Sequence, residues 1–185
     1  RLCTERGALL IMDEIQTGLG RTGRWFGYQH ADITPDVVVL AKGLAGGVPM
    51  GAVAWRTALG NIENSTHGST FGGNPLACAS AVATIQTLQT IDAPTRANNL
   101  GVLFANALRE QNLTGVREIR SLGLMVGLEL RGRVSPVVQA LQAHGILALV
   151  AGKTVLRFLP PLIITGTELE QTASILADVL NEVSA

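Results

Sequence analysis

The feature that most constrains the fold is a pair of short apolar runs, each of which ends in a charged residue. Residues 8–12 read Ala-Leu-Leu-Ile-Met and precede Asp13, and residues 37–41 read Val-Val-Val-Leu-Ala and precede Lys42. Neither run alternates apolar with polar residues, which is typical of parallel strands covered on both faces. The two runs therefore predict an α/β sheet whose strands carry Asp13 and Lys42 at their carboxyl ends.

The rest of the chain alternates between segments typical of strands and of helices. The predicted strands span residues 8–13, 37–41, 50–55, 122–130, 146–150 and 155–159. The predicted helices span residues 75–91, a segment after Pro94, and residues 136–143 and 168–183. We place a domain boundary near residue 92, with an α/β sheet in residues 1–91 and a smaller α+β unit in residues 92–185.

Composition excludes several classes of protein. Fourteen Lys and Arg balance fourteen Asp and Glu, and this formal charge of 0 argues against a nucleic-acid binder. With 47% hydrophobic and 15% charged residues, the chain is not intrinsically disordered. It has no apolar run long enough for a membrane span, and its histidines lack metal-ligand spacing. Two cysteines form no disulfide framework, so we expect a cytoplasmic protein. From the histidine spacing we expect that it binds no metal.

The first residues suggest a longer parent protein. The chain begins Arg1-Leu2-Cys3 without an initiator Met and reaches its first apolar run at residue 8. A strand covered on both faces needs neighbouring strands and helices. We therefore expect the chain to be the C-terminal part of a longer protein.

The charged residues at the two strand ends suggest a cofactor site. In open α/β sheets, ligands bind beyond the carboxyl ends of the strands. A lysine there can form a Schiff base, and a carboxylate can keep the pyridine nitrogen of pyridoxal phosphate protonated. Each residue alone also fits a structural role, because Lys42 could extend from the sheet rim into solvent and Asp13 could cap a turn.

Of two glycine-rich segments, one fits a phosphate-binding loop and the other does not fit the dinucleotide-binding motif that it matches. Residues 67–75, His-Gly-Ser-Thr-Phe-Gly-Gly-Asn-Pro, lead into a predicted helix, and their hydroxyls and amides suit a phosphate. A polar loop with an incidental helix cap would have the same composition. Residues 18–23 match the G-x-G-x-x-G pattern of dinucleotide-binding folds, but residues 24–36 lack the helical periodicity that this fold requires.

Taken together, these blocks resemble the class III pyridoxal-phosphate aminotransferases. The resemblance rests on residues 10–18, 35–36, 40–43, 46–47 and 67–75. Residues 121–129 (SLGLMVGLE) and 156–162 (LRFLPPL) are most similar to acetylornithine aminotransferases, in particular to the bacterial branch acting on acetylornithine or on carrier-linked lysine. The resemblance implies a fold-type-I transferase, with part of the large cofactor domain in residues 1–91 and the small C-terminal domain in residues 92–185.

The resemblance also implies roles for residues around the cofactor. Lys42 would form the Schiff base with pyridoxal phosphate and then move the proton. Asp13 would pair with the pyridinium nitrogen, and Gln16 would bond the phenolic oxygen of the ring. Ile15 would pack against one face of the ring.

Other residues would reach a second subunit or the substrate. By the same resemblance Thr70, supported by Ser69, would contact the phosphate of the neighbouring subunit's cofactor, which implies a homodimer. Arg157 would bind the α-carboxylate of glutamate or 2-oxoglutarate, and a guanidinium between Leu156 and Phe158 suits a planar anion. A structural ion pair is the alternative role for Arg157.

The reaction implied by the resemblance is a ping-pong transfer of an ω-amino group to 2-oxoglutarate. The donor would be N-acetylornithine or a related N-blocked ornithine or lysine, in arginine or lysine biosynthesis, and an amino-group carrier protein would be a partner in the lysine branch. Ornithine or 4-aminobutyrate as donor, or a non-catalytic fragment, stay open as alternatives. The family's N-terminal portion is absent from the sequence, so we expect residues 1–185 alone to be inactive and to expose apolar surface around residues 8–12 and 37–41.

Overall fold

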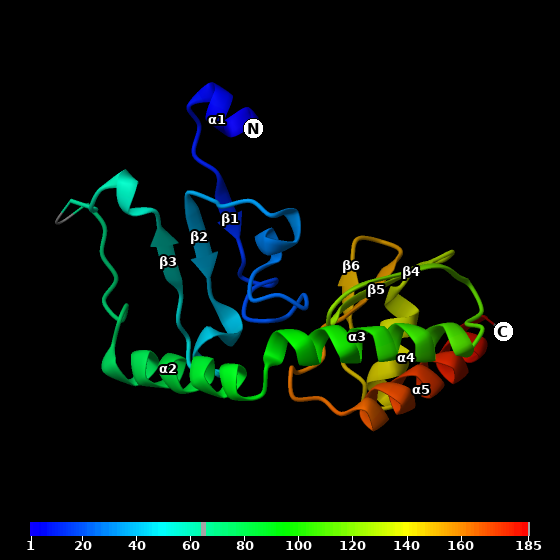
Figure 1. Ribbon diagram of the computed structural model, residues 1–185. Helices are drawn as coiled ribbons and strands as arrows, with labels where there is room; N and C mark the ends of the chain where they lie inside the picture. The colour runs from blue at the N-terminus through cyan, green and yellow to red at the C-terminus, as the bar shows by residue number, and fades with distance from the viewer. Residues whose placement is uncertain (64–65, 185) are drawn as a thin grey trace. The chain divides into compact units, whose positions relative to one another are not determined.

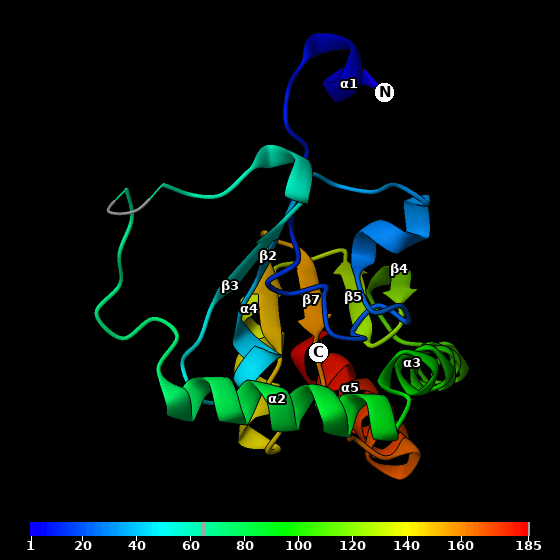
Figure 2. The ribbon, with the colours of Figure 1, turned by 60° about the vertical axis from the view of Figure 1, so that its left-hand side comes forward.

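The computed structural model describes residues 1–63 and 66–184 and divides the chain into two compact units, residues 1–93 and 94–185 (Figures 1 and 2). We expected a boundary between residues 91 and 92, and the observed division falls between Ala93 and Pro94.

The first unit contains a three-stranded sheet of order β1-β2-β3 (Figure 1). Strand β1 (Ile11–Asp13) pairs in parallel with β2 (Val37–Leu40), and β3 (Ala52–Trp55) runs antiparallel to β2. The helical elements of this unit are α1 (Leu2–Arg6), η1 (Gly27–Ala31), η2 (Lys42–Ala45), η3 (Thr57–Leu59) and α2 (Pro75–Thr90). The parallel pairing of β1 and β2 agrees with the two apolar runs in the sequence.

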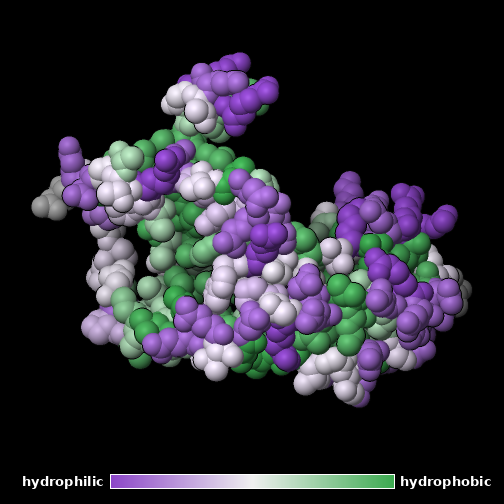
Figure 3. Space-filling view, viewed as in Figure 1, coloured by the Kyte–Doolittle hydropathy of each residue, from purple (hydrophilic) through white to green (hydrophobic). Residues whose placement is uncertain are grey.

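The strands of the first unit are less covered than their apolar composition predicts. Leu9 is 54% exposed and Ile11 is 58% exposed, although both belong to the run predicted as a buried strand. Within the described residues, β1 pairs with β2 alone. Figure 3 shows green apolar surface over the strands of this unit. The apolar surface expected around residues 8–12 is therefore present.

The second unit is a four-stranded antiparallel sheet with helices on one face (Figure 2). Its strands, in the spatial order β4-β5-β7-β6, are β4 (Val116–Leu122), β5 (Met125–Leu130), β7 (Val155–Phe158) and β6 (Leu149–Ala151). Its helices are α3 (Ala93–Glu110), α4 (Ser135–Ala143) and α5 (Gly166–Ser184). Alternate residues of β5 and β7 pack against these helices, and the rings of Phe104 and Phe158 meet edge to face with centroids 5.5 Å apart.

The prediction of one strand over residues 122–130 was wrong. The segment is the end of β4, a tight turn and β5, and Leu122 pairs with Met125. Gly123 makes the turn with φ 54°, and α3 packs closely against it, because a Cβ on Gly101 would lie 2.0 Å from the Gly123 oxygen. Leu124 is fully buried in this turn, so the apolar run continues through the turn and conceals it. Strand β6 also begins later than residue 146, at Leu149.

Candidate active site

The candidate site is built on the carboxyl ends of β1 and β2. Asp13 is the last residue of β1 and lies opposite Val39, and Lys42 follows the end of β2 by two residues. Because β1 and β2 are adjacent and parallel, both residues lie at the same edge of the sheet. The side chains of both residues are exposed. The structure thus brings together the amine and the carboxylate that the sequence singled out.

Lys42 has an unusual backbone conformation. Its φ of 50° lies in the left-handed region, which lysine rarely occupies. It begins η2, and this turn is fastened to α2, because Ser80 Oγ donates a 2.8 Å hydrogen bond to the Ala45 oxygen. Leu44 and Ala45 are buried in the same contact. A residue whose backbone is held in a strained conformation by well-packed neighbours is typical of functional sites.

Asp13 caps the turn that follows β1. Its Oδ1 accepts a 3.0 Å hydrogen bond from the backbone N–H of Ile15. The capping role considered from the sequence is therefore real, and it also fixes the carboxylate relative to the next residues. Ile15 and Gln16 are half-buried in this turn.

Glu14 is a site residue that the sequence reasoning missed. Its side chain is 2% exposed and accepts hydrogen bonds from the backbone N–H of Gly27 (2.9 Å) and of Tyr28 (2.8 Å). It also accepts from the Thr17 hydroxyl. No local signal in the sequence identifies this role, because the two amides lie thirteen and fourteen residues further along the chain.

The loop predicted to bind phosphate leads into α2. Asn74 caps this helix, accepting from the Ala77 N–H at 3.0 Å and donating to the Phe71 oxygen at 2.9 Å. Ser69 Oγ accepts from the Gly72 N–H at 3.1 Å, and both Ser69 and Thr70 are exposed. The loop lines a cavity of about 220 Å³ together with residues 49–51.

Arg157 lies in the second unit, on the sheet face opposite the core. It pairs with Gly127 on β5, and Gly127 also pairs with Arg120 on β4, so one cross-strand row carries two arginines on either side of a glycine. Both arginines line a cavity of about 290 Å³. Leu156 and Phe158 belong to the buried core on the other face, so they do not flank the guanidinium as the sequence suggested.

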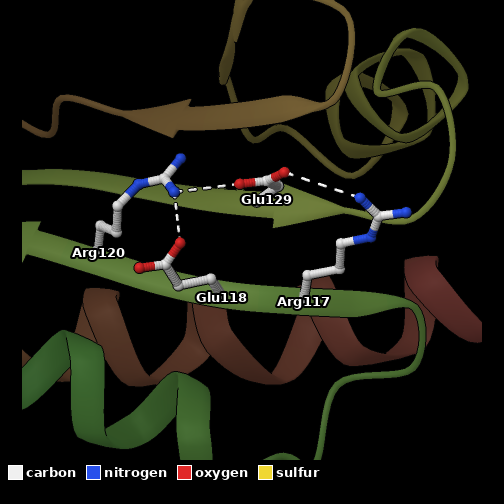
Figure 4. Close-up of polar contacts among 4 residues, drawn as sticks. All are labelled: Arg117, Glu118, Arg120 and Glu129. Atoms are coloured by element: carbon white, nitrogen blue, oxygen red, sulfur yellow. Dashed lines mark hydrogen bonds and ion pairs between the residues drawn. The ribbon is translucent and has the colours of Figure 1, made fainter.

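Arg120 belongs to a cluster of four charged residues on this face (Figure 4). It contacts Glu129 at 3.1 Å and also Glu118, and Arg117 lies 3.9 Å from the other oxygen of Glu129. The hydrogen bonds to Glu129 and Glu118 raise the pKa of Arg120 above its usual value. Because two arginines face two glutamates, the formal charges of the cluster cancel. This cluster was not predicted from the sequence, because its members come together through the β4–β5 pairing.

The described residues contain neither a candidate metal site nor a helix that could span a membrane. Among residues 1–63 and 66–184, there is no group of three or more His, Cys, Asp or Glu side chains that could hold a metal ion. None of the helices in the described part of the chain is long and apolar enough to cross a membrane.

Comparison with known proteins assigns the family. Residues 1–180 match the family described as aminotransferase class-III. The chain belongs to this family. It is 44% identical over 185 residues to acetylornithine aminotransferase 1 of Bordetella bronchiseptica, covering 98% of this chain and 47% of the relative. It is 46% identical over 183 residues to acetylornithine aminotransferase of Gloeobacter violaceus, covering 97% of this chain and 46% of the relative. The chain spans about half the length of these curated relatives.

Solved structures agree with this assignment. The chain matches the ornithine aminotransferase of Toxoplasma gondii with a TM-score of 0.89 and 37% identity, covering 99% of this chain and 45% of that chain. It matches acetylornithine aminotransferase of Elizabethkingia anophelis with a TM-score of 0.88 and 33% identity, covering 98% and 47%. These matches confirm the predicted family, its fold-type-I architecture and its dependence on pyridoxal phosphate.

Proposed function

We propose that the complete gene product transfers an ω-amino group to 2-oxoglutarate, with N-acetylornithine or a related N-blocked ornithine or lysine as donor. The observation that carries this proposal is the pair Asp13 and Lys42, which end adjacent parallel strands at one edge of the sheet. An amine and a carboxylate so placed are the two groups that pyridoxal-phosphate chemistry requires of a protein.

The residues at this edge fit the cofactor. When bound, pyridoxal phosphate supplies a reactive carbonyl and an electron-accepting pyridine ring. Lys42 would hold the cofactor through its Nζ, and the same amine, once the substrate amine has displaced it, would move the proton between the substrate carbon and the cofactor carbon. The Asp13 carboxylate holds the proton on the pyridine nitrogen. Gln16 donates to the phenolic oxygen, and Ile15 packs against the ring.

The loop before α2 serves a second subunit in this proposal. Ser69 and Thr70 are exposed, and they precede the capped N-terminus of a helix, where backbone N–H groups favour anions. These features support contact between Thr70, assisted by Ser69, and the phosphate held by the neighbouring subunit. The functional unit would then be a homodimer.

Arg157 binds the carboxylate of 2-oxoglutarate and of glutamate in this proposal. It lines the cavity beside Gly127, where the missing side chain leaves room for a ligand. A guanidinium is well suited to a carboxylate because it can donate two parallel hydrogen bonds.

Among the donors, we propose N-acetylornithine first. The curated relatives at 44% and 46% identity are named acetylornithine aminotransferases, whereas an ornithine aminotransferase of an Exiguobacterium species is 41% identical. We place the reaction in the cytoplasm, in arginine or lysine biosynthesis, with an amino-group carrier protein as partner if the donor is carrier-linked lysine. Ornithine is the second candidate, since the Toxoplasma structure is an ornithine aminotransferase.

A donor comparison tests this proposal. The complete gene product, saturated with pyridoxal phosphate, is assayed with 2-oxoglutarate and with N-acetylornithine, ornithine or 4-aminobutyrate. We expect the highest kcat/KM for N-acetylornithine and no turnover by residues 1–185 expressed alone. A higher kcat/KM for ornithine would make ornithine the assigned donor. No turnover of any of these ω-amines by the complete gene product would refute the proposed function.

A further inference from the structure

We infer that Glu14 is a positioning residue for the cofactor site, which holds Ile15 and Gln16 in register with Asp13. This inference rests on the proposed function, because it assumes that these neighbours contact the cofactor. Glu14 itself is buried, so it acts through the loop that it organises and not by touching the ring.

The contacts of Glu14 join both ends of one loop. Its backbone N–H donates to the Val39 oxygen at 3.0 Å, which extends the pairing of β1 and β2 by one residue. Its carboxylate accepts from the N–H groups of Gly27 and Tyr28, thirteen and fourteen residues further along the chain. The loop of residues 15–28 therefore starts directly after Glu14, and its last residues are hydrogen-bonded to the Glu14 carboxylate.

The glycines show how tightly the backbone surrounds Glu14. A Cβ on Gly27 would lie 3.3 Å from both carboxylate oxygens, and a Cβ on Gly18 would lie 2.9 Å from the Glu14 backbone oxygen. That oxygen accepts from the Gly18 N–H at 3.0 Å. Side chains at either glycine would push the loop away from the carboxylate, so the turn containing Ile15 and Gln16 has little freedom.

A carboxylate is the group that this arrangement needs. Both of its oxygens accept hydrogen bonds, Oε1 from Tyr28 and Oε2 from Gly27 and Thr17. A glutamine in the same place would present an NH2 group to one of these donors. One buried N–H would then lose its acceptor, and the loop would move to relieve the conflict.

The chain offers a matched control at the opposite end of the same strands. Asp36 accepts a hydrogen bond from the Leu10 N–H at 2.8 Å and pairs with Arg56 at 3.1 Å. It also ties β1 to β2 through a carboxylate and a backbone amide, but at the amino ends of the strands. Loss of Asp36 should therefore weaken the sheet without displacing Gln16.

The experiment compares Glu14→Gln with Asp36→Asn in the complete gene product. It measures the dissociation constant of pyridoxal phosphate for the cofactor-free protein, the absorption spectrum of the bound cofactor, and thermal unfolding of the cofactor-free protein. We expect Glu14→Gln to weaken cofactor binding by about tenfold or more and to shift the absorption maximum. We expect Asp36→Asn to lower the unfolding temperature. Its affinity for pyridoxal phosphate should stay within about twofold of that of the unmodified protein, and its absorption maximum should not move.

A milder variant keeps the inference testable if Glu14→Gln does not fold. Thr17→Val removes one donor to the carboxylate and leaves the charge in place, and it should change affinity and spectrum in the same direction by a smaller factor. Unchanged cofactor affinity and absorption spectrum in Glu14→Gln would overturn the inference. If Glu14→Gln is unfolded, the same result in Thr17→Val would overturn it. An equal loss of cofactor affinity in Asp36→Asn would also overturn it. If the unmodified protein does not bind pyridoxal phosphate, the proposed function itself fails.

Discussion

The strained backbone at Lys42 predicts that, at this position, the usual order of stability of glycine and alanine variants is reversed. At most positions glycine is less stable than alanine, by about 0.5–1 kcal/mol, because glycine gives the unfolded chain more freedom. Lys42 has a φ of 50°, which glycine adopts readily and other residues do not. We therefore predict that Lys42→Gly is more stable than Lys42→Ala, although both variants lose the reactive amine.

The magnitude follows from two opposing effects. The left-handed conformation costs an L-residue roughly 1–2 kcal/mol, and alanine keeps this strain whereas glycine relieves it. The added freedom of the unfolded glycine chain offsets about 0.4–1 kcal/mol of that gain. The difference between the variants should therefore lie between about 0 and 1.6 kcal/mol in favour of glycine, with a central value of about 0.8 kcal/mol. Lys42 is exposed, so truncating its side chain removes little packing from either variant.

Urea unfolding of the cofactor-free variants measures this difference directly. The cofactor must be removed from all samples, because a ligand that binds only the folded protein raises its apparent stability. Ala79→Gly, at an exposed position of α2, is the control for the ordinary sign and should destabilise by about 1 kcal/mol. A stability of Lys42→Gly below that of Lys42→Ala would show that the backbone at residue 42 is unstrained.

Three further variants test the site and the second unit. Asp13→Asn should still bind pyridoxal phosphate but lose turnover, because an amide cannot hold the pyridinium proton; near-normal kcat would leave Asp13 as a turn cap only. Arg157→Ala should raise the KM for 2-oxoglutarate by about tenfold or more while the cofactor spectrum stays the same, and an unchanged KM would favour a structural ion pair. Thr165→Ala should destabilise the protein by about 1 kcal/mol, since Thr165 and Glu168 exchange capping hydrogen bonds of 2.8 and 3.3 Å at the start of α5. The pKa of Glu168 is lowered because its carboxylate accepts hydrogen bonds from the Thr165 backbone N–H (2.8 Å) and the Thr165 hydroxyl (2.7 Å). Their contribution to stability is full above the unfolded pKa of Glu168 and is lost as the pH falls through the folded pKa. Thr165→Ala removes the hydroxyl bond but keeps the backbone bond, so the pH dependence of urea unfolding should become weaker without disappearing.

The sequence predicted that Asp13 and Lys42 lie at one edge of the sheet because the relevant signals are local. Asp13 and Lys42 each follow an uninterrupted apolar run, and the ends of parallel strands meet at one edge of a sheet. Asn74 and Pro75 likewise mark the start of α2 through capping preferences that act within a few residues. For such features, the pattern of neighbouring residues is enough.

The features that the sequence did not give depend on distant pairings. Glu14 is defined by amides thirteen and fourteen residues away, and no local pattern identifies them. The turn at Gly123 was hidden because Leu124 is apolar and buried, as a strand residue would be. The setting of Arg157 follows from its pairing with Gly127, which no periodicity within residues 155–159 specifies.

The assignment of Lys42 is tested by identifying the lysine that binds the cofactor. The sequence contains only two lysines, Lys42 and Lys153, so the chain supplies its own control. The complete gene product is loaded with pyridoxal phosphate, reduced with borohydride, digested and analysed by mass spectrometry. The structure predicts a pyridoxyl phosphate adduct on the peptide that contains Lys42 and none on the exposed turn at Lys153. An adduct on Lys153 in place of Lys42, or no adduct on Lys42, would show that Lys42 does not bind the cofactor.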